Sequence, residues 1–195
     1  MQEDKVAFII GNGTSRKDFD LNKLRGAGTI IGCNALYREF EPDLLVSIDA
    51  GIIEEILESD FPKDRFIVPE LDECWEPADC NPNRPRSNAG MNAMFEAVKR
   101  GHNVLVCFGF DFLVWDKTQS VSNVYEGSQN YGPENKANFA DNHGRIRYLA
   151  WFAKKNPTIS LVFVFPPNYN LTTIPECDNI LYVTYDLLIK NLHSV

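Results

Sequence analysis

The sequence lacks the segments that mark membrane and secreted proteins. Its 195 residues contain no run of about 18 apolar residues, so we expect no transmembrane segment. The start, Met-Gln-Glu-Asp-Lys, has no charged stretch followed by an apolar one, so we expect no signal peptide. The five cysteines are odd in number, irregularly spaced and without a C-x-x-C metal pair. These absences predict a cytoplasmic protein with reduced thiols.

Basic charge is also scarce. Nineteen Lys and Arg residues stand against 27 Asp and Glu, which gives a formal net charge of −8. Such a field repels nucleic acids and anionic membranes, so we expect no nucleic-acid partner. Hydrophobic residues make up 44% of the chain, enough for a full core. Length and composition therefore predict a single domain over residues 1–195.

The common phosphate and metal motifs are incomplete. A Gly-rich turn, Gly11-Asn12-Gly13-Thr14-Ser15, follows the apolar run 6–10, but Arg16 stands where a dinucleotide fingerprint has its third glycine. No Gly-Lys-Ser/Thr follows, which excludes a P-loop, and no Asp-x-Asp is found at Asp43 and Asp49. The turn is still typical of an α/β protein that brings bare backbone N–H groups to a nucleotide. An ordinary tight turn is the alternative.

Short apolar runs alternate with segments of helical periodicity. The expected strands are 6–10, 29–33, 44–48, 65–68, 103–108, 160–165 and 180–183, and the expected helices are 51–57, 88–101 and 143–155. This alternation predicts a Rossmann-like α/β fold, with a mostly parallel sheet flanked by helices. Two long loops interrupt the pattern, 69–86 and an irregular, lid-like segment at about 113–140. Apart from its short strand, we expect the C-terminal part to be a polar tail.

Polar residues cluster where the strands end. These ends are Gly11-Asn12-Gly13, Asn34, Asp49, Gly109-Phe110-Asp111 and Pro166-Pro167-Asn168. Ligands of parallel sheets bind beyond the carboxyl ends of the strands, so we expect several of these residues around one crevice. Asparagine amides both donate and accept, which suits hydroxyl and phosphate groups, although each asparagine also suits a turn.

Several blocks of the chain resemble one family in its order. They are Gly11-Asn12-Gly13-Thr14-Ser15, Gly32-Cys33-Asn34, Arg86-Ser87-Asn88-Ala89-Gly90, Gly109-Phe110-Asp111-Phe112, and His143 ahead of a helix, a strand and Pro167-Asn168. Together they resemble the bacterial sialyltransferases that use CMP-sialic acid, the family of the Campylobacter-type lipooligosaccharide enzymes. The chain is similar to that family as a shorter, divergent relative that lacks its membrane-associating C-terminal part.

The resemblance implies a metal-independent glycosyltransferase. It would transfer a sugar from a CMP-activated donor to the hydroxyl of a saccharide acceptor, without cofactor or metal. The nucleotide would contact the residues Gly11, Asn12, Gly13, Thr14, Ser15, Asn34, Asp49, Arg86, Asn88, Ala89, Gly90, Gly109, Phe110 and Asp111. The family often forms tetramers, so a homo-oligomer is also implied.

Thr14 stands where the family has proline, and three further positions depart from the family pattern at residues to which the family gives a functional role. Asp49 replaces an asparagine, Ala89 a serine and Leu113 a tyrosine that assists the leaving phosphate. Tyr125 and Tyr131 are candidates to replace that tyrosine. A nucleotide-sugar site is therefore better supported than sialic acid as the donor sugar.

His143 is the expected catalytic residue. Imidazole accepts a proton near neutral pH, as deprotonation of an acceptor hydroxyl requires. A surface histidine at a helix start is the alternative, and His102 and His193 are expected to be structural or exposed. Asp111 is expected to brace its loop through backbone N–H groups. Arg86 is a candidate to pair with a phosphate or a carboxylate, and a solvated loop residue is the alternative.

Two further functions compete with glycosyl transfer. One is a pterin or nucleotide diphosphotransferase, which needs Mg²⁺ and a carboxylate pair, for which Asp49 and Asp111 are the candidates. The other is a non-catalytic nucleotide-binding protein that keeps the fold and has lost the chemistry.

Overall fold

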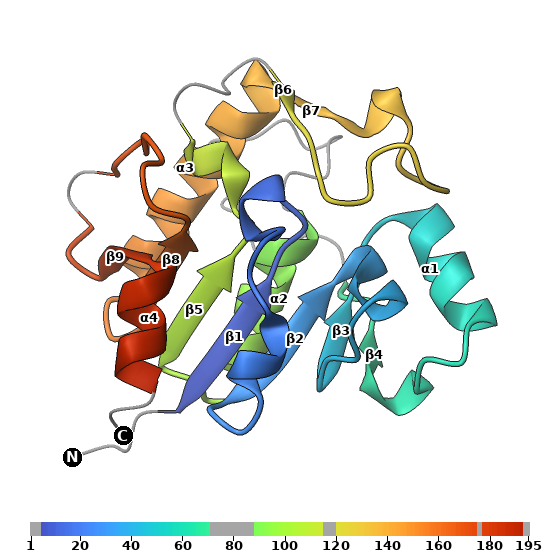
Figure 1. Ribbon diagram of the computed structural model, residues 1–195, viewed down its shortest axis with the longest axis horizontal. Coiled ribbons are helices and arrows are strands. Elements are labelled where there is room, and N and C mark those ends of the chain that lie inside the picture. Colours follow the sequence, from blue (N-terminus) through green and yellow to red (C-terminus); the bar gives the residue numbers. More distant parts are fainter. Residues whose placement is uncertain (1–4, 71–87, 115–119, 175–176, 193–195) are drawn as a thin grey trace.

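The computed structural model describes residues 5–70, 88–114, 120–174 and 177–192. In these ranges the chain forms an α/β structure around a seven-stranded, all-parallel sheet, which confirms the Rossmann-like fold (Figure 1). Its strands are β1 Val6–Ile10, β2 Thr29–Cys33, β3 Leu44–Val46, β4 Phe66–Ile67, β5 Val104–Phe108, β8 Ser160–Phe165 and β9 Ile180–Thr184. All seven lie within two residues of their predicted bounds.

The strand order creates a switch point between β1 and β5. The order across the sheet is β4-β3-β2-β1-β5-β8-β9, so the chain builds outward from β1 and then returns to its other side. The last residues of the two strands, Ile10 and Phe108, are paired in register. Their following turns therefore leave the sheet at the same level, where α/β sheets bind ligands.

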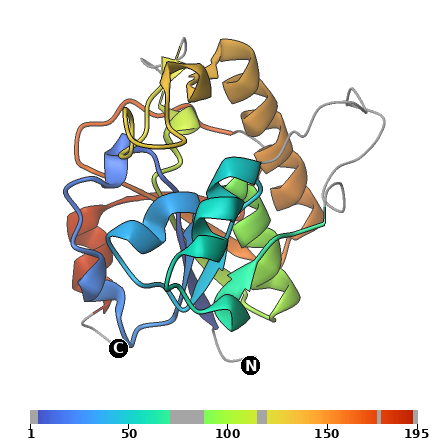
Figure 2. The same ribbon diagram turned by 90° about the vertical axis from the view of Figure 1, so that its right-hand side faces the viewer.

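Helices cover both faces of the sheet, as the view along its edge shows (Figure 2). Ala7 and Ile9 of β1 contribute to one buried cluster, and Phe8 and Ile10 to the other. The first cluster includes residues of α2 (Ala89–Lys99) and α3 (Phe139–Lys155); the second includes residues of α1 (Ala50–Glu58) and α4 (Tyr185–Leu192). Burial on both faces explains why the strands read as continuous apolar runs.

Helix α3 begins four residues before its predicted start. Asn138 caps it, because its side chain accepts from the Asp141 N–H at 2.9 Å while Asp141 accepts from the Asn138 N–H at 3.0 Å. This reciprocal pair satisfies two backbone groups that the helix itself leaves free. His143 is consequently inside the helix rather than at its start.

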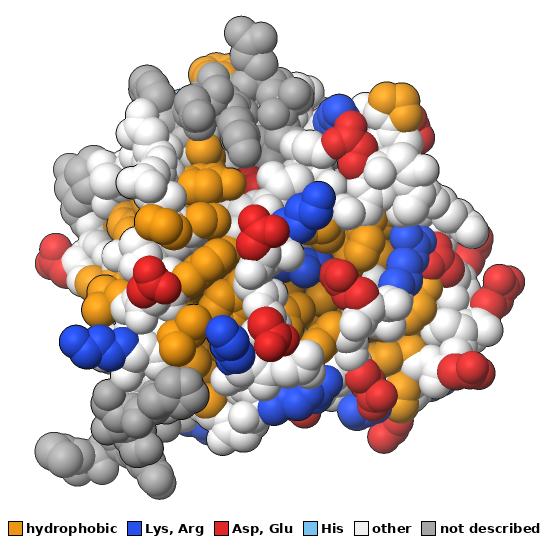
Figure 3. Space-filling view, viewed as in Figure 1, with side chains coloured by type: hydrophobic (Ala, Val, Ile, Leu, Met, Phe, Trp, Pro, Cys, Tyr) orange, Lys and Arg blue, Asp and Glu red, His pale blue; other side chains and the backbone are white. Residues whose placement is uncertain are grey.

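The expectation of a polar C-terminal tail was wrong for residues 185–192. They form α4, which buries Leu188 against the sheet and leaves Leu187 48% exposed. Figure 3 shows apolar side chains gathered over this part of the surface. The short amphipathic pattern of Tyr185-Asp-Leu-Leu-Ile is stabilised as a helix by this packing.

The segment 120–138 contains little regular structure, as expected for the lid-like region. Two short antiparallel strands, β6 Ser120–Val121 and β7 Ala137–Asn138, bracket it, and a 3-10 turn spans Pro133–Asn135. It lies across the carboxyl end of the sheet (Figure 1). We refer to residues 120–138 as the covering segment. Residues 115–119 of the predicted lid, and nearly all of the predicted loop 69–86, lie outside the described residues.

No helix in the described ranges has the length and apolar character needed to cross a membrane.

Candidate functional site

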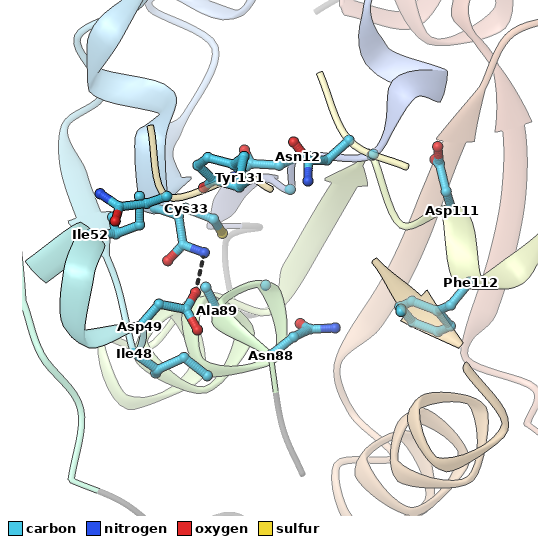
Figure 4. Close-up of a pocket in the computed structure, with 18 of the residues that line it drawn as sticks. Asn12, Cys33, Ile48, Asp49, Ile52, Asn88, Ala89, Asp111, Phe112 and Tyr131 are labelled. Carbon is cyan, nitrogen blue, oxygen red and sulfur yellow. Dashed lines mark hydrogen bonds between the residues drawn. The ribbon is translucent and has the colours of Figure 1, made fainter. Parts of the chain in front are cut away.

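A cavity of about 600 Å³ lies beyond the carboxyl ends of β1, β2 and β5. It contains the switch point between β1 and β5 (Figure 4). The predicted residues that line it are Gly11, Asn12, Gly13, Asn34, Asp49, Asn88, Ala89, Gly90, Gly109, Phe110, Asp111 and Tyr131. Four predicted residues in the described ranges, Thr14, Ser15, Tyr125 and His143, are not part of its lining. Arg86 lies outside the described residues.

The glycines of the β1 turn join it to the β5 turn. The N–H of Gly11 donates to Phe108 O at 2.9 Å, and the N–H of Gly13 donates to Gly109 O at 3.0 Å. A Cβ on Gly13 would lie 2.4 Å from Cγ of Asp111. The expectation that both turn glycines offer bare N–H groups to a ligand was therefore wrong. These donors are used by the carbonyls of Phe108, at the end of β5, and of Gly109, in the turn that follows, and the glycines permit close packing of the two turns.

Arg16 braces the same turn from behind. Its side chain is 4% exposed; Nε donates to Gly11 O at 2.7 Å and Nη2 pairs with Glu39 at 2.8 Å. At the position where a dinucleotide fingerprint has its third glycine, this chain therefore has an arginine whose side chain holds the turn.

Asn12 connects the β1 turn to the covering segment. Its Nδ2 donates to the hydroxyl oxygen of Tyr131 at 3.3 Å. Tyr131 is 7% exposed, and burial raises the pKa of its phenol to about 12. A phenol that stays protonated can donate a hydrogen bond to a ligand oxygen. Tyr131 is the member of the predicted tyrosine pair that reaches the cavity.

Tyr125 has a different role in the covering segment. Its hydroxyl donates to Glu39 at 2.6 Å and accepts from Arg16 at 3.0 Å. Burial raises the pKa of the Tyr125 phenol well above its usual range. These contacts attach the covering segment to the β1 turn and to the end of the 3-10 helix Asn34–Arg38. The structure therefore places Tyr125 in a bracing position.

Asn34 adopts a left-handed conformation at the end of β2, with φ of +51°. Its Nδ2 donates to Oδ2 of Asp49 at 2.7 Å, so the ends of β2 and β3 are linked across the cavity wall (Figure 4). Non-glycine residues adopt this conformation at a cost, and asparagine tolerates it best. Asn130, the second cavity residue with this geometry, has φ of +64°.

Asp111 braces the first turn, as expected. Its Oδ2 accepts from the Ser15 N–H at 3.0 Å and from Thr14 Oγ1 at 3.1 Å. Asp111 is 2% exposed, and a buried charge without hydrogen-bond donors would destabilise the fold. The Ser15 and Thr14 donors are therefore important for keeping this carboxylate buried. Thr14 and Ser15 thus act on the site through Asp111 rather than by lining the cavity.

The N-terminus of α2 forms part of the cavity. Asn88 caps this helix, with Oδ1 accepting from the Met91 N–H at 3.0 Å. Ala89 and Gly90 follow in the lining, and a Cβ on Gly90 would lie 2.9 Å from the Phe110 ring. The unpaired N–H groups of a first helical turn favour negative charge.

His143 and Arg145 of α3 face nearly opposite ways. His143 is exposed, and its ring stacks on Phe139 with centroids 5.9 Å apart. Arg145 lines the cavity. Residues two apart on a helix point to nearly opposite sides. The structure thus places the predicted base outside the cavity lining, and its catalytic role stays a prediction.

Arg145 was missed by sequence reasoning, although the sequence contained a signal. It precedes the buried residues Tyr148, Leu149 and Phe152 by three, four and seven positions. A charged residue at this spacing lies on the buried stripe of its helix. The covering segment adds further polar residues to the lining, for which the sequence had no comparable signal because the segment is irregular; they are Ser122, Asn123, Asn130 and Glu134.

Cys33 lines the cavity but is not a thiolate. It is 2% exposed, and burial raises the pKa of its thiol to about 12. Nucleophilic cysteines require the thiolate form. The site therefore offers oxygen and nitrogen groups for chemistry.

The two carboxylates needed by a magnesium-dependent transferase do not form a pair. Asp49 and Asp111 lie on opposite sides of the cavity (Figure 4), and each accepts hydrogen bonds from neighbouring side chains. In the described ranges, His, Cys, Asp and Glu side chains do not gather in threes or more where they could hold a metal ion. Asp49 and Asp111 are therefore not placed as the carboxylate pair that the alternative diphosphotransferase function requires.

Comparison with protein-family models, curated proteins and solved structures finds no match to this chain.

Proposed function

We propose that the protein binds a CMP-activated sugar in this cavity and transfers the sugar to an acceptor hydroxyl without a metal. The observation that carries the proposal is the meeting of Asn12, Asn34 and Asn88 around one cavity at the switch point of a parallel sheet. Three amides from three strand and helix ends suit a ligand rich in hydroxyl groups. The resemblance to CMP-sialic acid-dependent sialyltransferases supplies the identity of the nucleotide.

In this proposal the two sides of the cavity have different roles. Asn34 and Asp49, linked by their 2.7 Å hydrogen bond, present a rigid pair for the nucleoside hydroxyls. Asn88 and the first turn of α2 provide donors for the phosphate. Asn12 holds Tyr131 in the wall between them.

Transfer breaks the bond between the sugar carbon and the phosphate oxygen, and CMP leaves with the electron pair. The neutral Tyr131 phenol donates a hydrogen bond to the departing phosphate. The acceptor oxygen bonds to the sugar carbon while a base removes its proton. His143 is the predicted base, and in this structure an acceptor would have to reach it outside the cavity lining.

The position of His143 favours a second candidate, nucleotide binding without turnover. Asn12, Asn34 and Asn88 line the cavity and can contact a nucleotide there. His143 is exposed and outside the lining, so it is not placed to take a proton from an acceptor in the cavity.

Binding and turnover are measured separately to distinguish these functions. CMP affinity is measured by calorimetry in EDTA, and CMP release is measured from a CMP-activated sugar with a saccharide acceptor. Glycosyl transfer predicts that His143→Ala keeps CMP affinity and loses turnover. Binding without turnover predicts CMP affinity and no CMP release in either protein. Absence of CMP binding would contradict both.

A further inference from the structure

Arg145 is a partly buried cation without a carboxylate partner among the described residues. Its Nη1 donates a hydrogen bond to Oδ1 of Asn142 at a long 3.4 Å. Asp49 and Asp141 act on it electrostatically, but in the described ranges no carboxylate lies within ion-pair distance of its guanidinium. Burial lowers its pKa, which reports the loss of water around the charge.

Two other shielded arginines show how this chain usually compensates such a charge. Arg16 pairs with Glu39 at 2.8 Å, and Arg38 pairs with Glu55 at 2.6 Å. Buried charges are normally paired, because removal from water is costly. Arg145 differs from both and lines the cavity, so its missing partner is best supplied by a ligand.

Three carboxylates line the cavity; hydrogen bonds from the protein hold two of them, Asp111 and Asp49, and the third, Glu134, is exposed. Oδ2 of Asp111 is held by Ser15 and Thr14, and Oδ2 of Asp49 is held by Asn34. Figure 4 shows Asp111 at the far side of the cavity from Asp49. Their negative charge is therefore partly satisfied within the protein.

Further donors line the same cavity. Oδ1 of Asn88 is used by the α2 cap, which turns its NH₂ group away from the helix (Figure 4). The first N–H groups of α2 also lack helical partners and carry the positive end of the helix dipole. A cation, an amide NH₂ group and a helix N-terminus around one cavity all favour an oxyanion.

We propose that Arg145 binds the phosphate group of the ligand in this cavity. The inference rests on the proposed function and deepens it by naming the residue that recognises the phosphate. A guanidinium gives a phosphate two parallel donors, which a lysine ammonium does not.

The test compares CMP with cytidine, which differ only by the phosphate. Dissociation constants are measured by calorimetry for the wild type and Arg145→Gln, with Arg147→Gln as the matched control on the exposed side of α3. We expect Arg145→Gln to weaken CMP binding about 10- to 100-fold and to leave cytidine binding unchanged. Arg147→Gln should bind both ligands as the wild type does. Arg145→Lys should recover part of the CMP affinity.

Two results would overturn the inference while leaving the proposed function standing. One is unchanged CMP affinity in Arg145→Gln. The other is an equal loss of CMP and cytidine affinity, which would indicate a general structural effect.

If wild-type protein binds neither CMP nor cytidine, the proposed function fails and the phosphate site is tested alone. Inorganic pyrophosphate should then raise the melting temperature of the wild type and of Arg147→Gln, but not that of Arg145→Gln. Absence of a pyrophosphate response in the wild type would overturn the inference as well.

Discussion

The hydroxyl oxygen of Tyr131 lies 3.3 Å from Nδ2 of Asn12, so the covering segment and the β1 turn meet in the cavity wall. Tyr125, six residues earlier, is directed to Glu39 and Arg16 instead. The two tyrosines should therefore respond differently to loss of the hydroxyl.

Tyr131→Phe is expected to lower turnover about tenfold or more, because it removes a donor to the leaving phosphate. Tyr125→Phe is the matched control. It should lower the free energy of unfolding by about 1 kcal/mol through its lost hydrogen bonds and leave turnover of the folded enzyme nearly unchanged. CMP release and urea unfolding are measured for both. Equal losses of turnover in Tyr131→Phe and Tyr125→Phe would contradict the assignment of Tyr131 as the donor to the leaving phosphate.

Gly13→Ala is expected to destabilise the protein by about 1–3 kcal/mol, because a Cβ would lie 2.4 Å from Cγ of Asp111 and 2.6 Å from Gly109 O. Gly144→Ala is the control, since its Cβ meets nothing within 4 Å and it lies inside α3. Alanine there should be neutral or stabilise the helix by about 0.5–1 kcal/mol. Urea unfolding measures both; a neutral Gly13→Ala would show that the two turns are loosely packed.

The contact of Arg38 with Glu55 should make stability depend on acid pH. Hydrogen bonding from Arg38 holds the pKa of Glu55 below its ordinary value of 4.5. A carboxylate with a lowered folded-state pKa contributes stability above the unfolded value. That stability is lost as pH falls from about 4.5 through the folded-state pKa.

Glu55→Gln should therefore be less stable than the wild type near neutral pH, with a difference that shrinks below about pH 4.5. Glu55 also accepts from Nδ2 of Asn130 at 2.9 Å, so the change should loosen the covering segment. Unfolding is followed from pH 7 to 3. A difference independent of pH would argue against the ion pair as its source.

Cys33 is expected to resist alkylation in the folded protein, because burial raises its thiol pKa to about 12. Iodoacetamide labelling is followed by mass spectrometry of the peptide that contains Cys33, with and without urea. Rapid labelling without urea would contradict its burial.

The sequence predicted the sheet well because its strands are apolar runs bounded by glycine and polar residues. The runs 6–10, 29–33 and 160–165 have the predicted bounds, and the polar residues after β1, β2 and β5 meet as parallel topology requires. Short helices were harder to predict from the sequence. Helix α4 depends on packing of Leu188 against the sheet, which a local pattern does not reveal.

The sequence also did not predict which N–H groups and side chains of the site point into the cavity. The N–H groups of Gly11 and Gly13 donate to the end of β5 and to the turn after it, more than 90 residues away in the chain. The side of α3 that faces the cavity depends on how the helix packs, which brought Arg145 rather than His143 into the lining. Motif spacing identifies residue types near a site, while tertiary contacts decide which of them a ligand can reach.

The most direct test of the central claim is thermal unfolding in EDTA with CMP, CDP, UDP, GDP and ATP, repeated with Mg²⁺. A ligand of the folded state stabilises it by about 2.7 kcal/mol at 100 times its dissociation constant. We predict that CMP raises the melting temperature in a saturable way and to the same extent with and without Mg²⁺. A shift that requires Mg²⁺ and a purine triphosphate, or no shift with any nucleotide, would contradict the proposal.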